Sequence, residues 1–219
     1  MTENQAREEI CRIGKSLFDR GYVHATAGNI SVRLDDGLLI TPTDACLGTL
    51  DPATLARLDA QGAQTGGLLA SKTVALHARV TSTAARFDPK TCCVIHTHSG
   101  HCVAWSLQAS GPELLPALTP YFVMKVGRVP LIPYHRPGAP EAVEAVAQAI
   151  VGYGEAGRPL RAVMLSRLGP NVWHDSPAHA MAVLEELEET ARLAFLVPQA
   201  APLSEPQIEE LRRNFGARW

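Results

Sequence analysis

The segment Asn29-Ile30-Ser31-Val32-Arg33-Leu34-Asp35-Asp36-Gly37-Leu38-Leu39-Ile40-Thr41, residues 29–41, carries the strongest fold signal in the chain. Apolar and polar side chains alternate over residues 29–34, and residues 37–41 form a short, mostly apolar run. Between them, Asp36-Gly37 is a dipeptide typical of a tight hairpin turn. The segment therefore predicts two antiparallel strands and argues against a purely parallel sheet.

Helical and strand patterns alternate along the rest of the chain. Apolar spacing and capping signals predict helices over residues 4–20, 71–86, 99–109, 140–153 and 177–196, and a final helix opened by a Ser204–Gln207 capping box. Apolar runs predict strands over residues 91–97, 129–134, 162–165 and 171–173, the last two flanking a Gly169-Pro170 turn. Residues 44–70 show no clear pattern. This order favours an α/β or α+β fold around one sheet over an all-β protein or a helical bundle.

The length and composition suit a single domain with a short appended segment. The chain has 219 residues, of which 46% are hydrophobic and 19% charged, as in ordinary globular proteins. Two prolines mark residues 198–203 as a linker. We expect one domain over residues 1–197, followed by a linker and a C-terminal helix over residues 198–219. A helix attached in this way is free to pack against a neighbouring subunit.

Charge and cysteine content exclude several partners and locations. The net charge is −2 and aromatic residues make up only 5%, which argues against binding to nucleic acid or to an anionic membrane. The five cysteines lack the spacing of a disulfide framework, and the first residues lack the blocks of a signal peptide. No apolar run is long enough to span a bilayer. We expect a cytoplasmic protein.

Two histidines follow the buried strand expected at residues 91–97. His96 and His98 are separated by one residue, so on a strand their side chains project from one face. Two imidazoles side by side at a strand end can bind one divalent cation. The alternative is a pair of polar residues where the strand meets solvent. His101 follows nearby and adds a third nitrogen.

Three other segments have the residue types of an anion-binding site. They are Gly28-Asn29-Ile30-Ser31, Thr41-Pro42-Thr43 and Ser71-Lys72-Thr73. The last one opens an expected helix, where backbone N–H groups bind anions and the hydroxyls and lysine add donors. Each segment alone also fits a turn glycine or a capping serine. Their occurrence together favours an anion site.

These four motifs, in this order and at this spacing, resemble those of the class II aldolase/adducin family. The resemblance covers about residues 8–197. Further matches indicate the branch whose members decarboxylate 3-oxo-tetronate 4-phosphate. Those matches are residues 14–22, Leu47-Gly48, 119–127, 133–138 and 185–191.

The resemblance implies a three-layer fold, with a central, mainly antiparallel sheet and helices on both sides. It implies a homotetramer with active sites between subunits, and zinc or another divalent metal on His96 and His98. It also implies a site for a small phosphorylated sugar acid, with Arg136 near the substrate carboxylate or capping its own turn. The phosphate-binding residues would be Gly28, Asn29, Thr43, Ser71 and Lys72.

The chain departs from the family at two functional positions. Thr73 stands where the family has its acid/base glutamate, and Leu168 stands where it has its third zinc histidine. Aldol cleavage needs a base, whereas decarboxylation of a β-keto acid mainly needs a cation near the developing enolate. The first departure therefore harms an aldolase more than a decarboxylase. We expect Tyr121 or water to supply the proton that the enolate takes up after carbon dioxide leaves. Thr73 occupies the catalytic position of the missing glutamate.

The third metal ligand has several candidates. We favour His135, in the expected strand-end turn, and the alternative is His101. His135 also fits a role in contact with solvent or substrate. His77 follows Thr73 on the same helix face and is interpreted as a packing residue.

The leading functional hypothesis is a metal-dependent lyase of carbohydrate metabolism. It would decarboxylate 3-oxo-tetronate 4-phosphate to dihydroxyacetone phosphate and carbon dioxide. A second hypothesis is a class II aldolase or decarboxylase for another small oxo acid, against which Lys72 argues. A third is a non-catalytic scaffold like adducin, which Thr73 and Leu168 favour and which the retained histidine pair disfavours.

Overall fold

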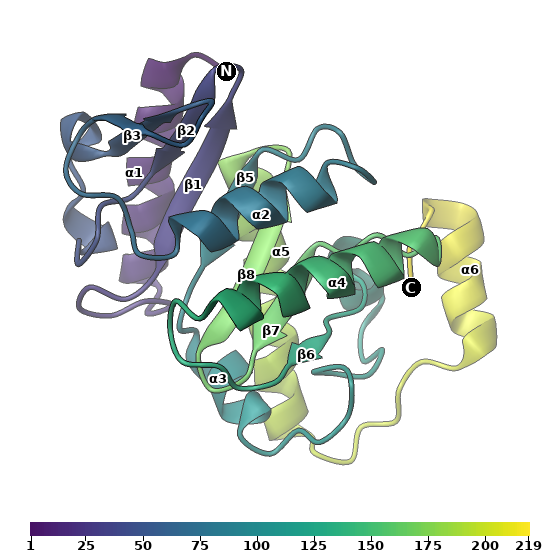
Figure 1. The fold of residues 1–219 in the computed structure, drawn as a ribbon. Coiled ribbons are helices and arrows are strands. Elements are labelled where there is room, and N and C mark those ends of the chain that lie inside the picture. The colour runs from purple at the N-terminus through teal and green to yellow at the C-terminus, as the bar shows by residue number, and fades with distance from the viewer.

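The computed structural model describes residues 1–219, which form one eight-stranded sheet with helices on both faces (Figure 1). The strands are β1 (Asn29–Leu34), β2 (Gly37–Ile40), β3 (Ala56–Asp59), β4 (Gln64–Gly66), β5 (Cys93–His96), β6 (Leu131–Ile132), β7 (Ala162–Leu165) and β8 (Gly169–His174). Their order is β4-β3-β2-β1-β5-β8-β7-β6, and only the β6–β7 pair is parallel. The predicted hairpin forms as β1–β2, and the mainly antiparallel sheet is confirmed.

Helices cover both faces of this sheet. One face carries α1 (Glu3–Asp19), α3 (Gly100–Ser106) and α5 (Pro177–Leu196), and the other carries α2 (Val74–Ala84) and α4 (Pro140–Glu155), which lie together in front of the sheet in Figure 1. Alternate strand residues project to opposite faces. Ile95 of β5 therefore joins the core under α1 and α5, whereas Val94 joins the core under α2 and α4. The three-layer expectation is confirmed.

Short polar motifs set the ends of the helices. Thr2 and Gln5 form a capping box at α1, and the Ser176 hydroxyl accepts the backbone N–H of His179 at the start of α5. The predicted capping box also opens α6 (Glu205–Phe215). Each side chain pairs with backbone N–H groups that have no partner within the helix. α2 begins at Val74 rather than at residue 71, so Ser71 and Lys72 lie in the turn before it.

Several elements were not expected from the sequence. Two strands, β3 and β4, form within residues 44–70, because β3 pairs with β2 and β4 then pairs with β3 at the edge of the sheet. This segment also contains two short 3-10 helices, Leu47–Thr49 and Pro52–Thr54, and a π-helical turn follows at Phe122–Val126.

The turn before β8 also differs from the prediction. Gly169 and Pro170 belong to β8 itself, and the turn lies at Ser166–Leu168, where Arg167 has a φ of 68°. Gly169 has a φ of 142°, and a Cβ atom there would overlap the carbonyl oxygen of Thr97. Glycine therefore lets β8 approach the backbone between the two histidines of the His-x-His pair.

The C-terminal segment packs within its own chain. Ile208 of α6 and Trp219 are buried in the larger core, and the Trp219 ring meets that of Phe122 with centroids 5.6 Å apart. The guanidinium of Arg128 lies 5.0 Å from the Trp219 ring centroid. The segment is thus anchored to its own chain, while its packing against a neighbouring subunit and the division at residue 197 stay predictions. No helix is both long and apolar enough to cross a membrane.

We predict that Trp219→Ala lowers the free energy of unfolding by about 3 kcal/mol, as for other buried tryptophans. The matched control is Phe215→Ala, since the Phe215 side chain is 67% exposed and should contribute within about 0.5 kcal/mol. Urea denaturation of both variants measures the difference. Equal midpoints would show that the segment is not part of the folded core.

Candidate active site

Three polar side chains form a row across the centre of the sheet. Asn29 of β1 and Asn171 of β8 each lie directly opposite His96 of β5, on the two sides of that strand. Directly opposite residues in an antiparallel pair project to the same face. The row lies on the face covered by α2 and α4, at the end of β5 where the chain continues to His98.

A cavity of about 260 Å³ lies beside this row. It is lined by the ends of β1 and β5, by the turns before α2 and after β2, and by the segment before α4. Its lining includes every predicted site residue except Tyr121 and His135. These residues are Gly28, Asn29, Thr43, Ser71, Lys72, Thr73, His96, His98 and Arg136.

His96 and His98 have the geometry of a ligand pair. Their ring centroids are 5.1 Å apart. Two imidazoles on one tetrahedral zinc, with Zn–N bonds of about 2.0–2.1 Å, place their centroids about 5 Å apart. Nδ1 of His96 lies 3.0 Å from the Pro170 carbonyl oxygen, which can only accept, so Nδ1 donates and Nε2 keeps its lone pair.

Burial keeps both rings neutral. It lowers the pKa of His96 to about 4, with a further contribution from His98. Burial also lowers the pKa of His98, helped by the nearby His24. Neutral imidazole is the form that binds metal. The donor chemistry of this pair therefore fits a divalent cation.

A buried network fixes the orientation of Asn29. Its Oδ1 accepts from Oγ1 of Thr73 at 3.0 Å and from Nε2 of His77 at 2.6 Å. Nδ1 of His77 lies 2.8 Å from Oγ of Ser31, which donates to it. Burial, with His96 nearby, lowers the pKa of His77 to about 3, so this ring is neutral. Since the amide oxygen is occupied, the amide nitrogen is the group that Asn29 offers to the cavity.

The network changes the interpretation of two residues. Thr73 already donates to Asn29 and contacts Oγ of Ser71 at 3.0 Å, so its hydroxyl positions other groups. His77 is not a simple packing residue, because both of its nitrogens hold site residues. The signal that could have revealed His77 was a histidine on a buried helix face, one turn after the Ser-Lys-Thr segment.

The charged groups of the cavity lie mainly at its mouth. Nζ of Lys72 is 4.0 Å from Oδ2 of Asp44, and their side chains are 78% and 76% exposed. Arg136 lines the cavity from the segment before α4. Asp44, which the sequence analysis did not select, brings a negative charge beside the lysine.

Two residues near the histidine pair, Leu168 and Asn171, are unusual for their positions. Leu168 lines the cavity with an apolar side chain. Asn171 is fully buried, and neither its Oδ1 nor its Nδ2 has a hydrogen-bond partner. An unpaired buried polar group costs about 1–3 kcal/mol. The site therefore contains an unsatisfied amide beside His96.

Three candidates from the sequence do not join the cavity within one chain. Tyr121 is 61% exposed, and His135 is half-buried beside Arg136 without lining the cavity. Nδ1 of His101 is 2.9 Å from Oε1 of Glu188, and the same carboxylate accepts two backbone N–H groups of α3. His101 thus links α3 to α5. The roles of Tyr121 and His135 stay predictions.

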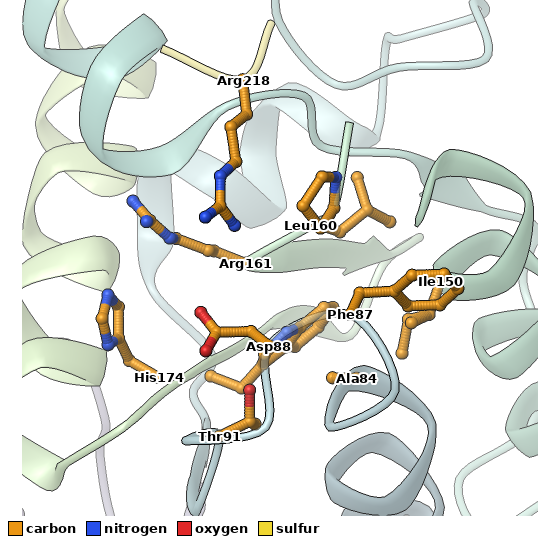
Figure 2. A pocket seen from close by; sticks show the side chains of 11 residues that line it. Ala84, Phe87, Asp88, Thr91, Ile150, Leu160, Arg161, His174 and Arg218 are labelled. Carbon is orange, nitrogen blue, oxygen red and sulfur yellow. The ribbon is translucent and has the colours of Figure 1, made fainter. Parts of the chain in front are cut away.

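A second cavity lies at the opposite end of β8 and is shown in Figure 2. Arg161, Arg218, Asp88 and His174 surround it, and its volume of about 10 Å³ is that of one water molecule. It is too small for a sugar acid. Next to it, His174, Asp175 and His179 place three possible ligand atoms within 4.8 Å of one another.

Comparison with known proteins places this site among characterised relatives. The 3-oxo-tetronate 4-phosphate decarboxylase of Cupriavidus necator is 47% identical, over 100% of this chain and 99% of its own. The protein in the crystal structure of YgbL from Klebsiella pneumoniae is 40% identical to this chain. It superposes with a TM-score of 0.82 over 97% of this chain and 100% of its own.

A more distant neighbour shares the fold. L-fuculose 1-phosphate aldolase superposes with a TM-score of 0.83 at 21% identity, over 97% of this chain and 96% of its own. The family model of the class II aldolase and adducin N-terminal domain matches residues 8–195. With the fold, the site and the full-length relative in agreement, the chain belongs to the class II aldolase/adducin family.

Proposed function

We propose that this protein is a carbon–carbon lyase that decarboxylates 3-oxo-tetronate 4-phosphate to dihydroxyacetone phosphate and carbon dioxide. The observation that carries the proposal is that one cavity contains both the neutral His96–His98 pair and Lys72. In the same cavity, the hydroxyl of Thr73 donates a hydrogen bond to Asn29 and stands where the family has its base. The 47% identical relative is named for this reaction. The family membership supports the lyase class.

The histidine pair is the proposed metal site. His96 and His98 would hold a divalent cation, which we propose to be zinc. When bound, the cation supplies positive charge that stabilises negative charge developing on a nearby oxygen. Because the Pro170 carbonyl fixes the His96 tautomer, Nε2 of His96 is ready to bind without rearrangement.

The segments around Lys72 and Thr43 in the same cavity form the proposed phosphate site. Lys72 supplies the cationic group, while Ser71 and Thr43 supply hydroxyls. The amide nitrogen of Asn29 adds a donor whose direction His77 and Thr73 fix. At Gly28, which has no side chain, the backbone itself lines the cavity and can approach the phosphate. Arg136 is proposed to bind the substrate carboxylate.

Decarboxylation suits these residues better than aldol cleavage does. The bond between C2 and the carboxylate breaks, its electron pair stays on the carbon skeleton as an enolate, and a proton then adds to carbon. This sequence requires no base to remove a hydroxyl proton, and Thr73 offers none. We propose Tyr121 as the proton donor, from a neighbouring subunit of a homotetramer, because it is exposed and lies outside its own cavity.

A non-catalytic, adducin-like scaffold is the alternative that specific residues favour. Thr73 and Leu168 remove the family's base and third imidazole. The decisive experiment is carbon dioxide release from 3-oxo-tetronate 4-phosphate by the wild-type protein supplied with zinc. Turnover supports the lyase, and no turnover at full metal loading would reject this reaction and leave the scaffold or a lyase for another oxo acid. A cytoplasmic location stays a prediction.

His98→Ala should abolish both metal binding at this site and decarboxylation. His98 is one of two adjacent imidazoles, and catalytic zinc generally needs three protein ligands, so the loss of one weakens binding strongly. Elemental analysis and carbon dioxide release measure the two losses, and circular dichroism verifies the fold. Retention of turnover by the metal-free variant would disprove the metal assignment.

Lys72→Ala should raise KM for the phosphorylated substrate about ten- to a hundredfold, since a charge-assisted hydrogen bond contributes about 1.5–3 kcal/mol. The metal content should not change, because the mostly exposed Lys72 side chain is not one of the proposed metal ligands. Steady-state kinetics measure the effect. An unchanged KM would remove the phosphate site from this segment.

Asp44→Asn should have the opposite effect and lower KM up to about fivefold, as expected for an exposed charge worth about 0.2–1 kcal/mol. The substitution removes the negative charge near Lys72, and asparagine tolerates the left-handed backbone, where φ is 55°. The same assay with the dephosphorylated substrate is the control. A raised KM would mean that Asp44 binds substrate itself.

A further inference from the structure

We propose that His24 is the third protein ligand of the metal on His96 and His98, in place of the imidazole missing at Leu168. This inference rests on the proposed metal site and assigns a new residue to it. His24 comes from the loop between α1 and β1, whereas Leu168 lies in the turn before β8. Leu168 lines the cavity, whereas His24 lies outside its lining and beside the ring of His98.

The ring of His98 lies next to the rings of both His96 and His24. The centroids of His96 and His98 are 5.1 Å apart and those of His98 and His24 are 6.2 Å apart, with both pairs edge-on. The first separation already matches a shared tetrahedral zinc, and the second exceeds the expected value of about 5 Å by about 1 Å. Binding of one cation by all three rings requires a side-chain rotation that brings the His24 ring closer to both His98 and His96.

The loop that carries His24 is fixed against the metal pair. Val23 is buried, and the Ala27 N–H donates to the His24 carbonyl at 2.9 Å. Gly28 has a φ of 84°, and a Cβ there would press on Val23 and on the His96 carbonyl. The backbone at His24 is therefore held beside β5.

The ring of His24 is also free to move. It is exposed and makes no side-chain hydrogen bond in the structure. An unpaired imidazole on an anchored backbone can turn toward a cation at little cost.

The other imidazoles are occupied or distant. Both nitrogens of His77 bind within the Asn29 network, and His101 binds Glu188. No ring contact joins His135 to His96 or His98, whereas the His24 ring lies beside that of His98. His174 and His179 lie at the other end of β8. His24 is thus the remaining imidazole within reach of His98.

The test compares zinc affinities of His24→Ala and His135→Ala. Every protein, the reference included, carries His179→Ala, so that the cluster of His174, Asp175 and His179 takes up no second ion. Competition with a chromophoric chelator should show at least about 100-fold weaker zinc binding for His24→Ala, because losing a ligand costs no less than losing a hydrogen-bond partner of one, which is about 10–100-fold. His135→Ala should bind as the reference does.

Cobalt spectroscopy of His24→Cys then tests direct coordination. A thiolate at position 24 should restore affinity and give a thiolate-to-cobalt charge-transfer band in the near ultraviolet, absent from the reference protein. Reference affinity in His24→Ala, or no such band in His24→Cys, would overturn the inference. If the His24 assignment is overturned but His98→Ala still loses zinc, the proposed metal site stands without His24. If the reference protein binds no zinc, both the metal site and the His24 assignment fail.

Discussion

The geometry of the cavity depends on the hydrogen bond between the buried ring of His77 and the amide oxygen of Asn29. This bond ties α2 to the first residue of β1, and Thr73 adds a second donor to the same oxygen. Since the pKa of His77 is lowered to about 3, the ring stays neutral and its donor and acceptor sides stay fixed. The amide of Asn29 therefore presents one defined face to a ligand.

The two sides of the cavity differ in electrostatic character. The side of the sheet carries neutral imidazoles, held neutral by burial. The side of the turn before α2 carries Lys72, beside Asp44, in contact with water. A ligand that is anionic at one end and bears a carbonyl near the other matches this division. The metal would contribute the missing positive charge on the buried side, where screening by water is weakest.

Much of this arrangement could be predicted from the sequence because its signals are local. The Asp36-Gly37 turn, the alternation in β1 and the Ser204 capping box each act within a few residues. The strands β3 and β4 could not be predicted, because hydrogen bonds to neighbouring strands of the sheet stabilise them. The clustering of Asn29, Lys72 and His96 was predicted from the resemblance to the class II aldolase/adducin family. The roles of His77 and Asp44, and the isolated amide of Asn171, depend on contacts that no spacing reveals.

The row Asn29–His96–Asn171 also has a kinetic consequence. Its three residues come from strands that are adjacent in the sheet but far apart in the chain. Contacts between distant segments form slowly, because loop closure must precede the pairing that stabilises it. The hairpin β1–β2 can form early, whereas the row exists only after β5 has entered between β1 and β8. Competence to bind a ligand is therefore a late product of folding, and no contiguous fragment of the chain possesses it.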